Sequence, residues 1–559
     1  MPKYAIGVDF GTLSARALVA EIGTGRELAD ATMDYPHAVM DRALPDGTPL
    51  RPDWALQHPQ DYLNCIAFVV PEALRKAGVS PDDVVGLGID FTSNTMLPVD
   101  VEGYPLCLKT EYASNPYAWT MLWKHHAAQK YASCMEQVAK ERGETFLARY
   151  GGKVSSEWMY PRLIQLLEEA PEICAAADRF IEAGDWIVQL LTGTDARSAC
   201  MAGYKAFWHR EDGYPSDDYL AALHPGLPEL IHDKLGRYLL PAGAMAGEIN
   251  DRGAKLVGLN PGTAVAPASI DAHVAFPAIG SAEPGDMLMI LGTSACHLTL
   301  GGEEHTVPGM CGVVAGGMTP DTFGYEAGQN CCGDHFKWLI ENCIPRRYED
   351  EADAKGISLH ALLTEKASAL RPGESGLLAL DWWNGNRSVL VDADLTGMLL
   401  GMTLATRPEE IYRALIEALA YGTRVIIEAF EANGVPVNAL YACGGIAKKN
   451  EMLMQIYADV LGREIRVARS TQAPALGSAM YGATAAGKTA GGYGSVTDAA
   501  KEMGGVDEKF YSPDSKNHAV YNELYAEYVR LHDYFGRGEN DVMKTLKEIK
   551  KRTVSADNR

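Results

Sequence analysis

Two short segments of the chain combine glycine with hydroxyl side chains in a pattern suited to binding phosphate. They are residues 9–16 (DFGTLSAR) and residues 291–294 (LGTS), and each follows an apolar run typical of a buried strand. Glycine leaves space for an anion beside the backbone N–H groups, and Thr and Ser hydroxyls donate hydrogen bonds to phosphate oxygens. The sequence therefore predicts two halves of a phosphate clamp, about half the chain apart.

The carboxylate of Asp9 lies where the first predicted strand ends, just before the Gly-Thr turn. Open α/β sheets bind ligands at the carboxyl ends of their strands, so this side chain is suited to holding Mg²⁺ through water beside a nucleotide. The alternative is an aspartate that only caps the turn. The neighbouring Thr12, Ser14 and Arg16 favour the metal and phosphate role.

A second acidic residue, Asp271, follows small residues that lead out of a predicted strand into an apolar helical segment over 273–279. A carboxylate there can deprotonate an alcohol that attacks the γ-phosphorus of ATP, because phosphoryl transfer needs positioning and charge neutralisation more than covalent help. The position alone favours a simpler interpretation, an ordinary helix N-cap.

Three further residues are suited to a sugar. Lys205 and Glu326 lie in aromatic, glycine-containing segments and are able to bind hydroxyl groups, while the face of Trp123 suits a sugar C–H surface. Taken singly, each has a simpler explanation. Lys205 could be a surface lysine, Glu326 could belong to a structural ion pair, and Trp123 could be a core residue.

Strand and helix patterns alternate along the first part of the chain. Residues 4–10, 15–22 and 84–90 have strand patterns, and a helix is predicted between them over about 58–76. Further helical patterns are at about 116–141, 159–169 and 185–191. This alternation is typical of an α/β domain.

The pattern begins afresh after the Gly- and Pro-containing segment 280–285. A helix is predicted over about 407–432, with Thr406 as its N-cap and Glu409 as its capping-box residue. A strand (439–442), two glycines, a helix (450–461) and a strand (464–468) follow. We predict two similar domains facing each other across a cleft, 1–280 and 281–495, and a helical C-terminal extension, 496–559.

Residues 482–489 (GATAAGKT) match the phosphate-loop pattern G-x-x-x-x-G-K-[ST] letter for letter. That loop requires a buried strand running into its first glycine and a helix beginning at Lys-Thr. Here residues 475–481 have a helical pattern, and the glycine-rich 490–494 continue a helix poorly. We therefore predict a small-residue helix packed on a sheet and ending near Gly487.

Composition narrows the function classes. With 559 residues, 47% of them hydrophobic, the chain is large enough for two cores. A formal net charge of −23 repels nucleic acids and anionic lipids, and no apolar run reaches the ~18 residues of a membrane span. The 11 cysteines show no C-x-x-C spacing, which fits a reducing compartment. We expect a cytoplasmic protein with no nucleic-acid or membrane partner, and a homodimer is left open.

Four segments together resemble the FGGY family of carbohydrate kinases: residues 9–16, 270–273 (IDAH), 291–294 and 443–455 (CGGIAKKNEMLMQ). They occur in the family's order within about residues 3–490. Longer strings at 90–98, 122–126, 155–161 and 202–209 are similar to the branch of the family that phosphorylates ribulose. The resemblance implies two ribonuclease-H-like (actin-like ATPase) domains around a central cleft, with ATP and Mg²⁺ between them.

The resemblance also implies a role for each matching residue. Asp271 is expected to be the catalytic base and, with Asp9, a metal ligand. The expected sugar ligands are Ser93, Trp123, Lys205, Asp271 and Glu326. The expected ligands of ATP are Gly11, Thr12, Ser14, Arg16, Gly292, Thr293, Gly444, Gly445, Lys449 and Asn450. The sequence departs from the family at Arg162, where many relatives carry lysine, and at Ser93, where the side chain varies.

The reaction expected from the resemblance is ATP-dependent phosphorylation of L-ribulose on its 5-hydroxyl, giving L-ribulose 5-phosphate and ADP in L-arabinose catabolism. Another pentulose or pentitol kinase, acting on D-ribulose, xylulose or ribitol, is the alternative within the family. An actin-like ATPase without a sugar substrate is the alternative from a different class.

Overall fold

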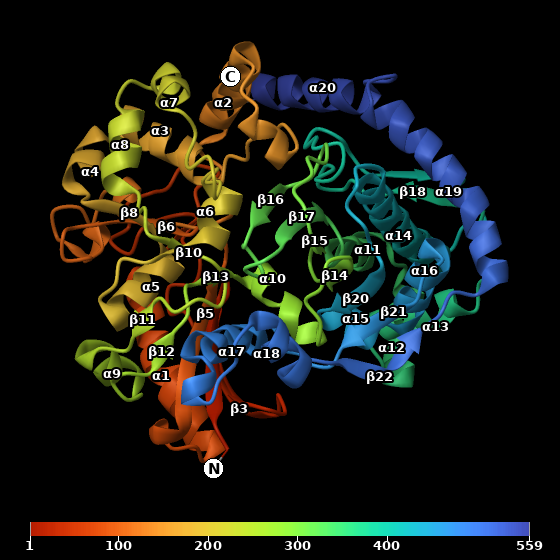
Figure 1. Ribbon diagram of the computed structural model, residues 1–559. Coiled ribbons are helices and arrows are strands. Elements are labelled where there is room, and N and C mark those ends of the chain that lie inside the picture. The colour runs from red at the N-terminus through yellow and green to blue at the C-terminus, as the bar shows by residue number, and fades with distance from the viewer. Residues whose placement is uncertain (1, 558–559) are drawn as a thin grey trace.

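The computed structural model describes residues 2–557 and has two halves, each built on a seven-stranded sheet (Figure 1). The N-terminal sheet has the strand order β11-β12-β5-β1-β2-β3, and β13 also pairs with β5. Its strands are β1 (Tyr4–Phe10), β2 (Ser14–Glu21), β3 (Glu27–Asp34), β5 (Val84–Phe91), β11 (Gly247–Glu248), β12 (Ala264–Val265) and β13 (Ser269–Ile270).

The C-terminal sheet repeats this central arrangement in the order β16-β17-β15-β14-β20-β21-β22. Its strands are β14 (Asp286–Leu291), β15 (Ala295–Gly301), β16 (Gly312–Ala315), β17 (Phe323–Gln329), β20 (Ala439–Cys443), β21 (Ile465–Ala468) and β22 (Val506–Tyr511). In each sheet an antiparallel hairpin, β1–β2 or β14–β15, is joined by a strand parallel to its first member, β5 or β20. This repeat confirms the prediction of two similar α/β halves.

Helix α1 (Pro59–Ala77) confirms the helix predicted over about 58–76, and it covers β2 and β3. It begins where His58 accepts a hydrogen bond from the Gln60 N–H, and it ends at Gly78, whose φ of 65° suits glycine. Other helices outside the insertion described next include α10 (Asp271–Val274), α11 (Gly333–Cys343), α12 (Arg346–Lys355), α13 (Leu359–Ser368), α14 (Pro408–Ala432), α15 (Gly445–Lys449) and α16 (Glu451–Leu461). A small sheet pairs β18 (Leu378–Leu380) with β19 (Met398–Leu400).

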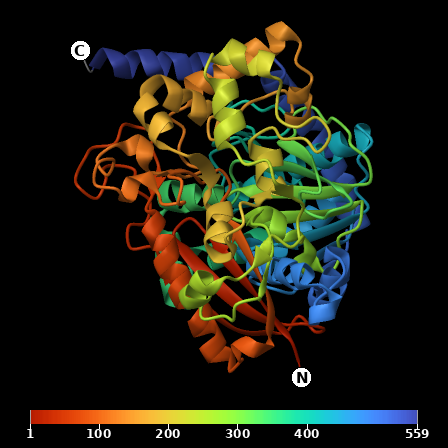
Figure 2. The same cartoon turned by 60° about the vertical axis from the view of Figure 1, so that its left-hand side comes forward.

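An insertion after β5 lies at the end of the N-terminal half opposite the chain's N-terminus (Figure 2). Its strands β6 (Met96–Val99), β7 (Thr120–Met121) and β8 (Arg179–Glu182) form a four-stranded sheet with β4 (Leu56–Gln57), which comes from the segment before α1. A separate strand pair joins β9 (Arg197–Ser198) and β10 (Leu239–Leu240). The helices of the insertion, with the α9 that follows, are α2 (Gln129–Arg142), α3 (Met159–Glu169), α4 (Pro171–Ala176), α5 (Ala183–Thr192), α6 (Ala199–Lys205), α7 (Asp217–Leu223), α8 (Leu227–Lys234) and α9 (Asp251–Val257). The predicted helix over 116–141 is wrong in its first half, because β7 pairs there with β4 and β6.

Helix α17 (Ala473–Ala486) packs on the N-terminal sheet although its sequence lies in the predicted second domain (Figure 1). The approach is so close that it requires glycine. A Cβ on Gly7 would lie 1.7 Å from the Ala475 carbonyl oxygen, and one on Gly88 would lie 1.9 Å from that of Ser478. The phosphate-loop-like Gly482 lies inside α17, so the prediction of a small-residue helix on a sheet is confirmed. A division of the chain into two domains near residue 280 would assign α17 to the second domain, although it packs on the sheet of the first.

The C-terminal segment is only partly helical, in contrast to the prediction. It contains α18 (Val496–Met503), β22, α19 (Ser515–Gly536) and α20 (Val542–Asp557), and β22 pairs antiparallel with β21 at the edge of the C-terminal sheet. The predicted cap of α14 is also displaced by one residue, because the backbone N–H of Arg407 donates to Glu410. Within residues 2–557, no helix has the length and hydropathy needed to cross a bilayer.

Candidate active site

Strands β1, β5 and β13 bring three carboxylates together, which we call the carboxylate cluster: Asp9, Asp90 and Asp271. Asp9 and Asp90 are opposite each other in the parallel register of β1 and β5, and Asp271 follows β13, which pairs with the end of β5. Ser478 of α17 donates a hydrogen bond to Asp90 at 2.6 Å, and the Ala272 N–H donates to Asp271 at 2.8 Å. Asp271 is the first residue of α10 rather than its cap, so the N-cap interpretation is wrong.

The protonation states of these three carboxylates differ. Burial, and then the charge of Asp9, raise the pKa of Asp271 to about 6 and raise the pKa of Asp90 well above its ordinary value. Burial also raises the pKa of Asp9, while a hydrogen bond from Asp90 and the charge of Arg16 oppose that rise. Carboxylates this close do not all ionise, so the shared proton resides on Asp90. Asp271 changes charge near neutral pH, as suits a general base.

A second acidic centre, the Glu326 cluster, joins the two halves of the molecule. Glu326 lies on β17 and is 3% exposed. Its Oε2 atom lies 3.2 Å from Lys205 Nζ and 3.2 Å from His273 Nε2, and its Oε1 atom contacts the Arg387 guanidinium. Although burial would raise it, Lys205 and Arg387 hold the pKa of Glu326 well below its ordinary value. Glu326 therefore stays ionised.

His273 and Arg387 are the members of this centre that the sequence analysis missed. Burial disfavours the charged imidazole, but Cys200 and Glu326 together raise the pKa of His273 to about 9. The Cys200 sulfur lies 3.2 Å from His273 Nδ1. His273 is two residues from Asp271 in a segment that resembles the family, which was a usable signal. Arg387 lies in an irregular segment between β18 and β19 and carries no comparable signal.

The two predicted phosphate turns are built alike, although the second is one residue shorter. The Gly11 N–H donates to the Ser14 carbonyl at 2.9 Å, and the Gly292 N–H donates to the Ser294 carbonyl at 3.0 Å, so each turn closes its hairpin. Gly444 has a φ of 95°, and a Cβ there would lie 2.5 Å from the Leu291 carbonyl oxygen. The predicted Gly444–Gly445 contact region therefore lies directly against the Gly292–Thr293 turn.

Side chains of the insertion reach the first of these turns. Trp123 Nε1 donates to Thr12 Oγ1 at 3.1 Å, which places Trp123 beside the phosphate turn rather than in a core. Ser93 Oγ accepts a hydrogen bond from the Asn94 side chain at 3.4 Å. The buried Arg162 donates to the carbonyl oxygens of Asn94 and Leu122 at 2.5 and 2.6 Å. Arg162 thus connects the segments that carry Ser93 and Trp123.

Other predicted ligands are not brought together. Arg16 donates to Thr32 at 3.0 Å, and Asn450 caps α16 by accepting from the Leu453 N–H at 3.0 Å. Lys449 is exposed at the end of α15. In the described part of the chain, no hydrogen bond or salt bridge links the Gly11 turn to the Gly292 turn. Lys205 is 4% exposed, so the surface-lysine alternative is wrong, whereas its ion pair with Glu326 is present.

Comparisons with known proteins agree with this architecture. Models of the N-terminal and C-terminal domains of the FGGY family of carbohydrate kinases match residues 4–277 and 287–486. A ribulokinase of Geobacillus thermodenitrificans is 54% identical over 99% of this chain and 98% of its own length. A ribulokinase of Mycolicibacterium smegmatis is 48% identical over 98% and 97%.

Among solved structures, a ligand-bound xylulose kinase from Lactobacillus acidophilus has a TM-score of 0.79 and 17% identity, covering 96% of this chain and 99% of that one. At that identity the likeness shows the fold, and it confirms the expected two-domain α/β architecture. The family models and the full-length relatives go further. The chain belongs to the FGGY family of carbohydrate kinases.

Proposed function

We propose that the protein phosphorylates L-ribulose on its 5-hydroxyl, using ATP and giving L-ribulose 5-phosphate and ADP. The observation that carries the proposal is Asp271, whose pKa is raised to about 6 and whose charge interacts with both Asp9 and Glu326. On one side of this base, Asp9 precedes the Gly11 phosphate turn. On the other side, the Glu326 cluster offers charged groups that suit sugar hydroxyls. The relatives named ribulokinase support L-ribulose as the sugar.

In this proposal Asp271 takes the proton of the 5-hydroxyl as its oxygen attacks the γ-phosphorus of ATP. Lys205 and Glu326 bind sugar hydroxyls, and Trp123 and Ser93 line the same region. The phosphates lie on Gly11, Thr12, Ser14, Arg16, Gly292 and Thr293, and the adenosine lies near Gly444, Gly445, Lys449 and Asn450. Lys205 of the N-terminal half and Glu326 of the C-terminal half already form an ion pair. This pairing fixes both side chains before the sugar binds.

The residues present also fit a magnesium ion. Asp9 and Asp271 offer carboxylate oxygens, which Mg²⁺ prefers, and neither takes part in a salt bridge within residues 2–557. When bound, Mg²⁺ neutralises charge on the phosphates of ATP. Asp9 and Asp271 would hold it, so that the uncompensated charge of the carboxylate cluster is balanced on binding.

We assign the sugar site and first phosphate turn to residues 1–280 and the adenosine side to 281–495, with 496–559 as an extension. The family models over 4–277 and 287–486 support this assignment, with α17 as the element that joins the two. The net charge of −23 argues against nucleic-acid and membrane partners, and the 11 cysteines without C-x-x-C spacing support a cytoplasmic enzyme.

The test is a coupled assay of ADP release with L-ribulose, D-ribulose, xylulose, ribitol and glycerol. We expect the highest kcat/KM with L-ribulose and little ADP release without sugar. Activity confined to xylulose or glycerol would overturn the substrate assignment. ADP release that ignores every sugar would instead support an ATPase.

A further inference from the structure

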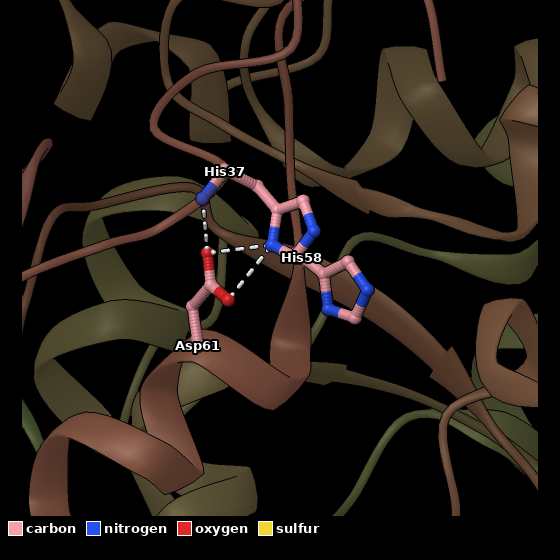
Figure 3. Close-up of side chains that lie close together, drawn as sticks. All are labelled: His37, His58 and Asp61. Atoms are coloured by element: carbon pink, nitrogen blue, oxygen red, sulfur yellow. Dashed lines mark hydrogen bonds and ion pairs between the residues drawn. The ribbon is translucent and has the colours of Figure 1, made fainter. Parts of the chain in front are cut away.

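Three metal-ligating side chains gather at the start of α1, outside the carboxylate and Glu326 clusters (Figure 3). His37 lies in the segment after β3, His58 is the N-cap of α1, and Asp61 is in its first turn. One ligand atom of each residue lies within 4.8 Å of the others. Residues from two separate segments therefore converge on one point.

The Asp61 carboxylate is buried and directed at His37 (Figure 3). Its two oxygens lie 2.9 and 3.2 Å from His37 Nδ1, and one of them also accepts the His37 backbone N–H at 3.0 Å. Asp61 is 2% exposed, and within residues 2–557 its only salt bridge is to this histidine. A buried carboxylate without a lysine or arginine partner favours a cation beside it.

His58 supplies a third ligand atom to the cluster, a ring nitrogen. Its Nδ1 atom accepts a hydrogen bond from the Gln60 N–H at 3.2 Å, so that nitrogen is unprotonated. A metal would therefore take the Nδ1 lone pair in place of the Gln60 N–H. The ring stacks on His37 with 4.2 Å between centroids and 18° between the ring planes, and Trp119 packs against it edge-on at 5.1 Å. Because imidazole lone pairs lie in the ring plane, the two rings must turn out of this stack to bind one ion.

We propose that His37, His58 and Asp61 form a binding site for a divalent transition metal of the Zn²⁺ type. Two imidazoles and one carboxylate suit Zn²⁺, whereas Mg²⁺ prefers oxygen ligands alone, so this site is distinct from the magnesium site proposed above. Binding replaces the proton shared by His37 and Asp61 and releases it to solvent. Water completes the coordination. Because the N-terminus of α1 repels cations, the charge of Asp61 is essential.

The test uses the full chain, stripped of metal by a chelator and dialysed against Zn²⁺. We expect one tight equivalent, and with Co²⁺ a visible absorption band of a four-coordinate site. His37→Ala and Asp61→Asn should each weaken binding by about tenfold or more. The His37 side chain is 40% exposed, so we expect its variant to keep the fold even if the Asp61 variant does not.

The matched control is His232→Ala. His232 also pairs with a carboxylate, Asp217 at 2.7 Å, but both side chains are exposed, and the pair belongs to no three-residue cluster among the described residues. Binding should be unchanged in this variant. The absence of saturable Zn²⁺ binding, or binding that survives His37→Ala, would overturn the proposal.

Discussion

The carboxylate cluster and the Glu326 cluster contain the same functional group but opposite surroundings. Asp271 and its two neighbours face one another, and burial raises the pKa of each. Glu326 is more deeply buried than Asp9 and Asp271, yet a lysine, an arginine and a histidine surround it and lower its pKa. Neighbouring charge, rather than burial, therefore decides which carboxylate exchanges a proton and which remains a fixed anion.

The sharpest way to break this comparison is Asp271→Asn. The amide cannot accept the proton of the attacking hydroxyl, so we expect kcat to fall by about 10²–10⁴-fold in the coupled ADP assay. ATP affinity should be largely kept. An exposed aspartate, Asp217→Asn, is the matched control with normal turnover. Near-normal turnover in Asp271→Asn would remove its role as the base.

The next effect concerns stability and the Glu326 cluster. Glu326→Gln leaves Lys205 and its cationic neighbours without their counter-charge, so the free energy of unfolding should fall by about 3–5 kcal/mol in urea denaturation. Glu304→Gln is the control, because Glu304 pairs with Arg149 at a more exposed position and should cost about 1 kcal/mol or less. Equal losses in the two variants would show that Glu326 is not a buried, charge-balanced anion.

The smallest effect is expected at Asp90. If this residue already holds the proton, Asp90→Asn changes neither charge nor shape, and its amide oxygen still accepts the hydrogen bond from Ser478. We expect the unfolding free energy to change by about 1 kcal/mol or less and kcat to stay within about threefold. A loss as large as that of Asp271→Asn would show that Asp90 works as an anion.

The features that sequence could predict are those set by neighbouring residues. The Gly11 and Gly292 turns each follow directly on a strand, and α1 has its cap, its apolar face and its terminal glycine within one segment. The phosphate-loop match was correctly rejected for the same reason, since the residues before Gly482 have a local helical pattern.

The features that sequence could not predict depend on contacts between distant segments. Arg387 reaches Glu326 from an irregular segment, and α17 crosses to the N-terminal sheet because Gly7 and Gly88 leave room for it. Strand β7 forms inside a predicted helix because β4 and β6 offer it partners. In each case tertiary pairing outweighs local preference.

The most direct test of the account is the pH dependence of kcat/KM for L-ribulose between pH 5 and 8. Asp271 must be ionised to accept a proton, and its pKa is raised to about 6. We therefore expect full activity above that value and a fall of about tenfold per pH unit below it. A profile that stays flat down to pH 5 would contradict the assignment of Asp271 as a base tuned by its neighbouring carboxylates.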